Sequence, residues 1–350
     1  MSIPKALIVS CAGKSLSQDE RRLFGAANPF GLILFSRNID NPTQVKALTD
    51  EFRACVGRMD APVFIDQEGG RVARMRHPHW EEFPAAAALG ELYQIDPVRG
   101  IAAGKLLGRM LAAQLLQVGI TVDCTPVLDI PVADANGVIG DRAFAKDPRI
   151  VTALGRAVCD GLRVGGVLPV MKHIPGHGRA MVDSHEELPT VGAAPDLLAD
   201  TDFVPFEKLA DIPLAMTAHI VYSEIDPAHC ATMSTKVIEG VIRQQLGFEG
   251  LLISDDVCMN ALQGSLPQRT RRVLDAGCDV ALVCQNSASF PPDTKVLQEA
   301  LEAAGPLSEA AQRRWKAACD WLRPMGLFDP KLARAEFNQL IPEGGLVKSA

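Results

Sequence analysis

Leu168-Pro-Val-Met-Lys-His-Ile-Pro-Gly-His-Gly178 joins an apolar run to a polar, glycine-rich segment. Residues 168–171 predict a short buried strand, and the proline and glycines after it predict a shaped loop. The loop and the Asp183-Ser-His185 segment behind it carry titratable side chains: Lys172, His173, His177, Asp183 and His185. Parallel α/β proteins place their chemistry where a buried strand ends. This stretch therefore predicts the fold class and the location of a site.

Apolar runs of the same kind recur along the chain and alternate with helical patterns. The runs are 6–10, 31–35, 62–65, 120–124, 168–171, 213–217, 250–254 and 279–283, and the helical patterns include 43–56, 99–118, 149–164, 235–246 and 266–276. Eight such units without a composition break predict a single α/β domain, a (β/α)8 TIM-type barrel over residues 1–330. A doubly wound open sheet is the alternative, but no glycine-rich phosphate fingerprint follows the first run.

The end of the chain departs from this alternation. We expect a last helix over residues 307–322 to pack outside the barrel, and residues 331–350 to form a C-terminal tail.

Composition narrows the class of protein. Of the 350 residues 47% are hydrophobic and only 5% are aromatic, which indicates a large aliphatic core. A net charge of −7 argues against nucleic acid or an anionic membrane as the main partner. Nine cysteines without a C-x-x-C pair predict free thiols in a reducing compartment. The apolar run at the start is too short for a signal peptide, so we expect a cytoplasmic protein.

Polar residues follow every predicted strand from the third to the eighth, and we expect them to surround one cleft because unpaired buried charge is costly. They are Asp66, Arg71 and Arg74; Asp123, Asp129 and Arg142; Lys172 and His173; His219; Asp255 and Asp256; and Asn286.

Four segments carry a resemblance to a known family: Asp66-Gln-Glu-Gly-Gly-Arg71, Ile139-Gly-Asp-Arg142, the Lys172–Gly178 string with Asp183-Ser-His185, and Leu252-Ile-Ser-Asp-Asp256. They resemble the bacterial glycoside hydrolase family 3 β-N-acetylglucosaminidases (β-hexosaminidases) of peptidoglycan recycling. The resemblance runs from about residue 31 to 286, and the Lys-His-x-Pro-Gly-His-Gly string is its most specific part. Ile174 replaces a usual Phe and Cys258 a common Ser, at positions without a chemical role.

The resemblance implies a retaining hydrolase that removes terminal GlcNAc from GlcNAc-1,6-anhydro-MurNAc, with or without peptide. Carried over position by position, Asp255 is the nucleophile that forms a glycosyl-aspartate, His185 is the acid/base, and Asp183 orients His185. A retaining glycosidase needs its two catalytic groups about 5 Å apart, and a histidine can exchange protons near neutrality. The implied substrate-binding residues are Asp66, Arg74, Arg142, Lys172 and His173. The resemblance implies no cofactor and no metal, and we expect a monomer.

Several of these residues also have structural interpretations. Lys172 and Arg142 could form ion pairs with Asp129 or Asp141, and Asp183 could stabilise a turn. We expect His177 to brace the loop and His77 and His79 to lie on the surface. Asp256 is expected behind the nucleophile or as a helix cap, whereas His219 fits either the site or the layer behind it.

Other functions stay open on the sequence alone. A metal-dependent amidohydrolase barrel would use His77, His79, Lys172, His173, His219 and Asp255, although His77 and His79 follow no predicted strand. A sugar-binding barrel without catalysis would not need Asp183, His185 and Asp255. The glycosidase intermediate could also be resolved by phosphate rather than water.

Overall fold

Eight parallel strands close into a barrel in the computed structural model of the chain, which describes residues 3–133, 137–182, 187–286, 291–324 and 326–341. Along the chain the barrel strands are β1 (Lys5–Ser10), β2 (Pro29–Leu34), β3 (Val63–Ile65), β6 (Val122–Asp123), β7 (Leu168–Ile174), β9 (Leu214–Thr217), β11 (Leu251–Asp256) and β12 (Val280–Val283). Strands β12 and β1 pair in parallel, with Leu7 opposite Ala281, and this pairing closes the barrel. The predicted (β/α)8 barrel is confirmed, and the open sheet is wrong.

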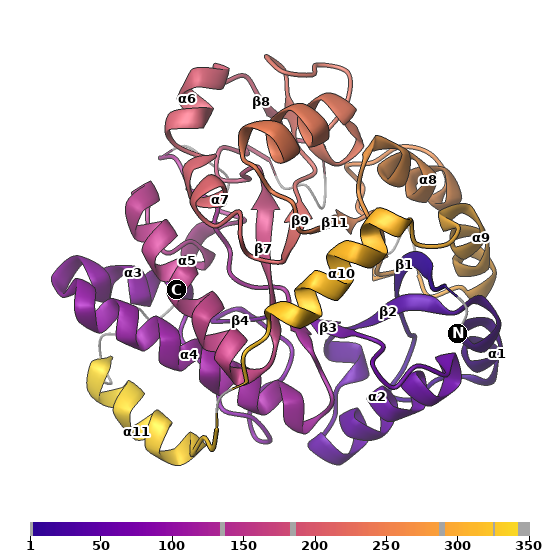
Figure 1. Ribbon diagram of the computed structural model, residues 1–350, viewed down its shortest axis with the longest axis horizontal. Helices are drawn as coiled ribbons and strands as arrows, with labels where there is room; N and C mark the ends of the chain where they lie inside the picture. Colours follow the sequence, from indigo (N-terminus) through magenta and orange to yellow (C-terminus); the bar gives the residue numbers. More distant parts are fainter. Residues whose placement is uncertain (1–2, 134–136, 183–186, 287–290, 325, 342–350) are drawn as a thin grey trace.

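Helices surround the barrel (Figure 1). They are α1 (Gln18–Ala27), α2 (Pro42–Val56), α4 (Pro97–Gln117), α5 (Pro148–Gly165), α7 (Val204–Lys208), the π-helix η4 (Lys236–Gln245), α8 (Leu266–Ala276) and α9 (Thr294–Ala304). Local sequence explains where three of them begin. Asn41, Asp96 and Asp147 accept hydrogen bonds from backbone N–H groups of the first turns of α2, α4 and α5, and each is followed by proline at the first helical position.

The connections after the barrel strands contain short elements of their own. They are the antiparallel pair β4 (Gln67–Gly69) and β5 (Val72–Ala73), the parallel pair β8 (Thr190–Val191) and β10 (Val221–Tyr222), the helices α3 (Ala86–Ile95) and α6 (Pro195–Asp200), and the 3-10 turns η1 (Ser36–Asn38), η2 (Gly140–Arg142) and η3 (Ala231–Met233). These connections follow the carboxyl ends of parallel strands, so they build up one end of the barrel.

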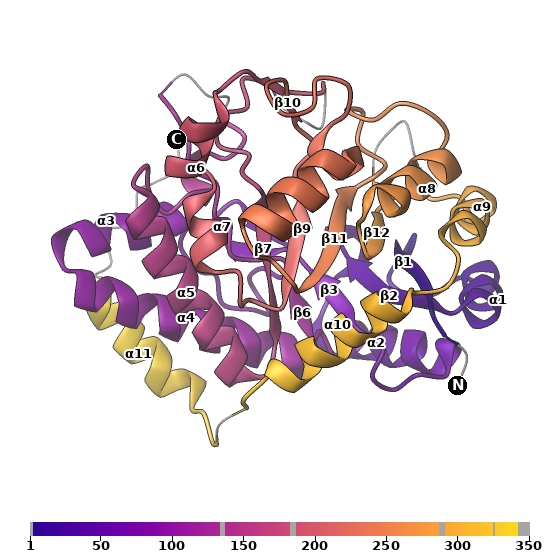
Figure 2. The same cartoon turned by 45° about the horizontal axis from the view of Figure 1, so that its top comes forward.

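Helix α10 (Glu309–Trp321) covers the other end of the barrel and crosses it in both views (Figures 1 and 2). Ala311 and Ala318 are fully buried in the same cluster as the inward-facing residues of the strands. The Trp315 ring lies edge-on to Phe30 at the start of β2, with ring centroids 5.0 Å apart. The helix expected over 307–322 therefore forms, and it closes the amino-terminal end of the barrel.

A further helix, α11 (Pro330–Leu340), lies in the segment where we expected a tail. Asp329 caps its first turn, and Phe337 is buried. Arg99 of α4 donates a hydrogen bond to the Leu340 carbonyl oxygen at 2.8 Å. The sequence pattern predicted no helix over these residues. The rest of the expected tail, residues 342–350, lies outside the described residues.

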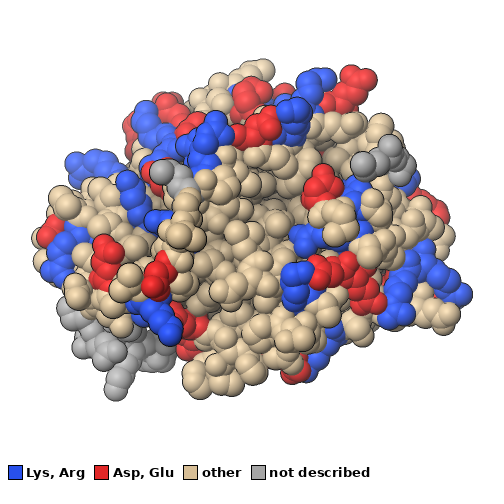
Figure 3. Space-filling model, turned by 60° about the horizontal axis from the view of Figure 1, so that its bottom comes forward, with Lys and Arg blue, Asp and Glu red and all other residues tan. Residues whose placement is uncertain are grey.

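All nine cysteines are free thiols, as predicted, and seven of them are buried. Among the described residues, no helix has the length and apolar character needed to cross a membrane. On the face shown in Figure 3, Lys and Arg side chains are interspersed with Asp and Glu around a broad uncharged area. The described part of that face therefore mixes both charge signs.

Candidate active site

A cavity of about 310 Å³ opens at the carboxyl end of the barrel. Its lining includes every described residue that we predicted to act in catalysis or substrate binding: Asp66, Arg74, Arg142, Lys172, His173 and Asp255. Strands β7 and β11, the connection after β3 and the turn η2 supply these side chains. The other two predicted catalytic residues, Asp183 and His185, lie outside the described residues.

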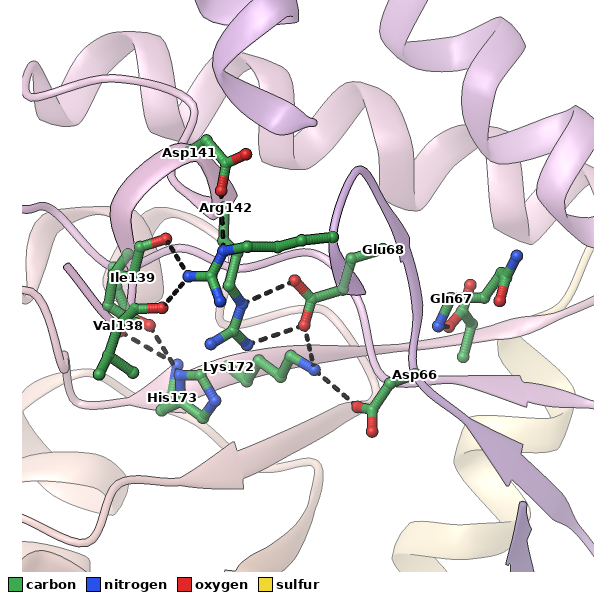
Figure 4. A network of polar contacts seen from close by, with 12 residues as sticks. Asp66, Gln67, Glu68, Val138, Ile139, Asp141, Arg142, Lys172 and His173 are labelled. Carbon is green, nitrogen blue, oxygen red and sulfur yellow. Dashed lines mark hydrogen bonds and ion pairs between the residues drawn. The ribbon is translucent and has the colours of Figure 1, made fainter. Parts of the chain in front are cut away.

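Asp66 and Lys172 form the centre of a buried charge network (Figure 4). The Lys172 Nζ atom lies 2.8 Å from Asp66 Oδ1, and Arg74 Nη2 lies 3.0 Å from Asp66 Oδ2. Burial by itself would raise the pKa of Asp66, but the cations of Lys172 and Arg74 outweigh it and hold the pKa well below its usual range. The cavity therefore presents a carboxylate and cationic donors, which form strong, directional hydrogen bonds.

Glu68 connects the cations of this network, although no role for it was predicted from the sequence. It accepts two hydrogen bonds from Arg142, at 2.9 and 2.8 Å, and its Oε1 lies 2.6 Å from Lys172 Nζ. Burial opposes ionisation of Glu68, yet Lys172 and Arg142 lower its pKa. The structural interpretation of Lys172 and Arg142 considered Asp129 or Asp141 as ion-pair partners, but Asp129 Oδ2 lies 2.7 Å from His173 Nδ1 and Asp141 pairs with Arg71 at 3.0 Å instead.

A tight turn between β4 and β5 brings Glu68 into this position. Gly69 and Gly70 follow it with φ values of 102° and 57°, which favour glycine. A Cβ atom on Gly69 would also come within 2.4 Å of the Pro84 carbonyl oxygen. The two glycines of the Asp66–Arg71 motif are thus the signal for the turn, although spacing alone does not say where Glu68 points.

Asp129 organises the histidine loop from behind the cavity. Its Oδ2 lies 2.7 Å from His173 Nδ1, and its Oδ1 accepts a hydrogen bond from the His177 backbone N–H at 2.6 Å. Burial would raise the pKa of Asp129, but His173 outweighs it and lowers the pKa to about 2. Because Nδ1 is occupied, His173 keeps Nε2 for a ligand. Burial lowers the pKa of His177 to about 4, so its ring stays neutral while its backbone braces the loop, as expected.

The two aspartates at the end of β11 differ in their surroundings. Asp256 Oδ1 accepts hydrogen bonds from the backbone N–H groups of Cys258 and Cys284, at 2.9 and 3.0 Å, and burial raises its pKa. Asp255 Oδ1 accepts the Asp256 backbone N–H at 2.8 Å. Asp256 therefore holds backbone at the cavity wall, which agrees with the expected supporting role.

The remaining polar residues at the strand ends separate into two layers. Asn286 lines the cavity, whereas Asp123, Asp129 and His219 are fully buried and are not among the lining residues. His219 Nε2 lies 3.0 Å from the Asp256 carbonyl oxygen and its Nδ1 lies 2.8 Å from Thr232 Oγ1, which resolves His219 as a residue of the layer behind the site. His77 and His79 are exposed, as expected, and do not line the cavity.

Residues 7–315 match the glycosyl hydrolase family 3 N-terminal domain. The chain belongs to glycosyl hydrolase family 3. A β-hexosaminidase of Alkalilimnicola ehrlichii is 41% identical over 81% of this chain and 82% of its own, and one of Bordetella avium is 36% identical over 91% of both chains. The family 3 chain is therefore a glycoside hydrolase of the β-hexosaminidase type.

Solved structures agree with this family 3 assignment. Native NagZ from Neisseria gonorrhoeae superposes with a TM-score of 0.79 at 29% identity, covering 97% of this chain and 99% of its own. The same protein has been solved in complex with N-trifluoroacetyl-D-glucosamine. The shared fold and family replace the amidohydrolase and the non-catalytic interpretations, and the exposed positions of His77 and His79 fit neither a metal site nor this cavity.

Proposed function

We propose that this enzyme is a retaining β-N-acetylglucosaminidase that removes terminal GlcNAc from peptidoglycan fragments such as GlcNAc-1,6-anhydro-MurNAc, with or without peptide. One observation supports it above others. The carboxylate-bearing end of β11, with Asp255, lines the same cavity as the Asp66, Lys172 and Arg142 network. A nucleophile beside fixed charged donors and acceptors suits attack on a hydroxyl-rich ring.

In the proposed mechanism Asp255 attacks the anomeric carbon and forms a glycosyl ester. The glycosidic C–O bond breaks as His185 donates a proton to the leaving oxygen. Water then attacks the anomeric carbon, His185 takes its proton, and the ester bond to Asp255 breaks. Two displacements at one carbon restore the β configuration. Asp183 keeps the imidazole of His185 in the right orientation and stabilises its charged form.

The described residues support the binding part of this proposal. Asp66 accepts hydrogen bonds from sugar hydroxyls, while Arg74, Arg142, Lys172 and His173 donate to hydroxyls or to the N-acetyl oxygen. Lys172 is held in the charged state, because Asp66 and Glu68 outweigh the effect of burial and raise its pKa. Specific sugar binding depends on such fixed polar groups, since a ring without its hydroxyls would leave them unpaired.

A slow fluorinated GlcNAc donor tests the nucleophile. The anomeric carbon should become attached to Asp255 with release of the leaving group, and mass spectrometry should find the added sugar in the peptide over residues 251–259. Asp255→Asn should abolish labelling, whereas Asp256→Asn should keep it. A label on Asp256, or a product with inverted configuration, would overturn the mechanism. Repeating the reaction in phosphate distinguishes hydrolysis from phosphorolysis, since only the latter yields a sugar phosphate.

A further inference from the structure

A side groove lies next to the active-site cavity. Asn260, which follows β11, lines both the active-site cavity and a second cavity of about 450 Å³. A third cavity, of about 400 Å³, shares His229, Met233 and Arg272 with the second. It reaches Lys236, at the start of η4. The side groove, defined as these two cavities, therefore lies beside the active-site cavity and is lined in part by residues of α8 and η4.

Two cations in the side groove are not neutralised within the described part of the chain. Arg272 and Lys236 are exposed and have no hydrogen-bonded or ion-paired acceptor among the described residues. Neighbouring Arg271, in contrast, pairs with Asp275, with Nη2 and Oδ1 2.9 Å apart. Unpaired cations on a concave surface favour an anionic ligand.

Two of the three acids that line the side groove have contacts of their own. Asp226 accepts hydrogen bonds from Ser234 Oγ at 2.6 Å and from the Ala228 backbone N–H at 3.1 Å, and Asp275 is held by Arg271. Glu187 lies on the second cavity, which adjoins the active-site cavity. In the third cavity, Lys236 and Arg272 therefore face acids that are already engaged with other groups.

The side groove also has apolar walls and a suitable size. Leu188, Met233 and Leu262 line the second cavity beside Arg272. Pockets that hold organic ligands have volumes of about 300–1,000 Å³ and combine apolar walls with a few polar groups. A sugar that carries a short peptide, with apolar side chains and free carboxylates, has the matching chemistry.

Residues of the side groove lie close in sequence to the proposed catalytic residues, which suggests that the groove lies on the aglycone side of the scissile bond. Along the sequence, Asn260 follows the proposed nucleophile Asp255 by five residues and Glu187 follows the proposed acid/base His185 by two. Asn260 and Glu187 both line the second cavity. The acid/base of a glycosidase protonates the oxygen that carries the aglycone. We propose that the side groove binds the aglycone, and that Arg272 and Lys236 recognise carboxylates on a peptide attached to it. This inference rests on the proposed function.

The test compares kcat/KM for two substrates, GlcNAc-1,6-anhydro-MurNAc with a carboxylate-bearing peptide and the neutral disaccharide chitobiose. Arg272→Gln and Lys236→Gln should each lower kcat/KM for the acidic substrate about two- to fivefold, and the double variant about tenfold, because exposed charge pairs are individually weak. The loss should appear in KM rather than kcat. It should shrink at about 0.5 M salt, where the Debye length is only a few ångströms.

Arg271→Gln is the matched control, since it removes a neighbouring charge on α8 that is already paired with Asp275. Chitobiose and this control should show unchanged kcat/KM. If the wild-type enzyme cleaves no β-GlcNAc substrate, the proposed function itself fails. If it cleaves them, but the double variant loses nothing or loses both substrates equally, the side groove is not a carboxylate-binding aglycone site.

Discussion

Glu68 is the carboxylate that pairs with both Lys172 and Arg142 in the cavity. It neutralises Lys172 and Arg142 from a position that is almost fully buried. Glu68→Gln leaves Arg142 with a neutral partner and Lys172 with Asp66 alone, and breaking a buried pair from one side costs roughly 3–5 kcal/mol. We expect a loss of that size in the free energy of unfolding, measured by denaturant titration, and a fall in kcat/KM.

Asp141→Asn is the control for Glu68→Gln. Asp141 pairs with Arg71 near the surface, where such pairs contribute about 1 kcal/mol at most. Its unfolding free energy should therefore stay within about 1 kcal/mol of the wild type. A Glu68→Gln enzyme as stable as Asp141→Asn would show that Lys172 and Arg142 do not need this carboxylate.

His185 is the residue whose proposed role can be separated from binding by leaving-group chemistry. His185→Gly should slow the natural disaccharide by about 10²-fold or more, because that leaving group needs a proton. Activated aryl glycosides leave without one and should be affected far less. Asp183→Ala should show a milder form of the same pattern, because the imidazole remains without its orienting partner. Measuring kcat/KM across leaving groups of graded pKa checks this. A uniform loss would mean that His185 positions the sugar only.

Strand β7 is longer than the apolar pattern of the sequence predicts. The apolar run predicted a strand over residues 168–171, but β7 continues to Ile174. Lys172 pairs with Met216 of β9, and its backbone N–H bonds to the Pro126 carbonyl oxygen. Neighbouring strands thus keep the backbone extended although the side chains turn polar. Such pairing joins residues that are distant in sequence, so a local pattern cannot reveal it.

For helix α10, the sequence pattern locates the helix but not the residues that it contacts. The helical pattern over 307–322 is correct, but only the barrel shows that Trp315 packs on Phe30 and closes its amino-terminal end. Trp315→Ala should lower the free energy of unfolding by about 3 kcal/mol, since large-to-small changes of buried aromatics cost 3–5 kcal/mol and Trp315 is only partly buried. The cavity lies at the opposite end, so kcat/KM should not change. Lys316→Ala, at the exposed neighbour, should alter neither.

At the scale of the whole molecule, the barrel was predictable because each of its strands is an apolar run between helical patterns. The gathering of Asp66, Arg142, Lys172 and Asp255 was predictable too, since parallel strands end at one face. Glu68, α11 and the side groove were not. Each depends on the direction of a side chain or on packing between distant segments, which periodicity does not record.

Buried histidines should also make the stability of the whole molecule depend on pH. Burial lowers the pKa of His177 to about 4 and lowers that of His219, so the folded protein binds fewer protons there than the unfolded chain. The contribution of these two histidines to the free energy of unfolding is then fully present above the unfolded pKa of about 6.5, and it is lost as the pH drops toward 4. Asp129 affects stability in a lower pH window. The pKa of Asp129 is about 2 in the folded state, so its contribution persists above about pH 4 and is lost below.

His177→Gln should remove its share of the loss between pH 6.5 and 4, which amounts to about 3 kcal/mol for a shift of this size. The variant keeps the backbone N–H that Asp129 accepts, so the loop retains that brace. Denaturant titrations at several pH values should show a flatter profile in this window, while exposed His79→Gln should reproduce the wild-type slope. An unchanged slope in His177→Gln would mean that another group carries the acid sensitivity, and the double variant with His219→Gln would identify whether it is the second buried imidazole.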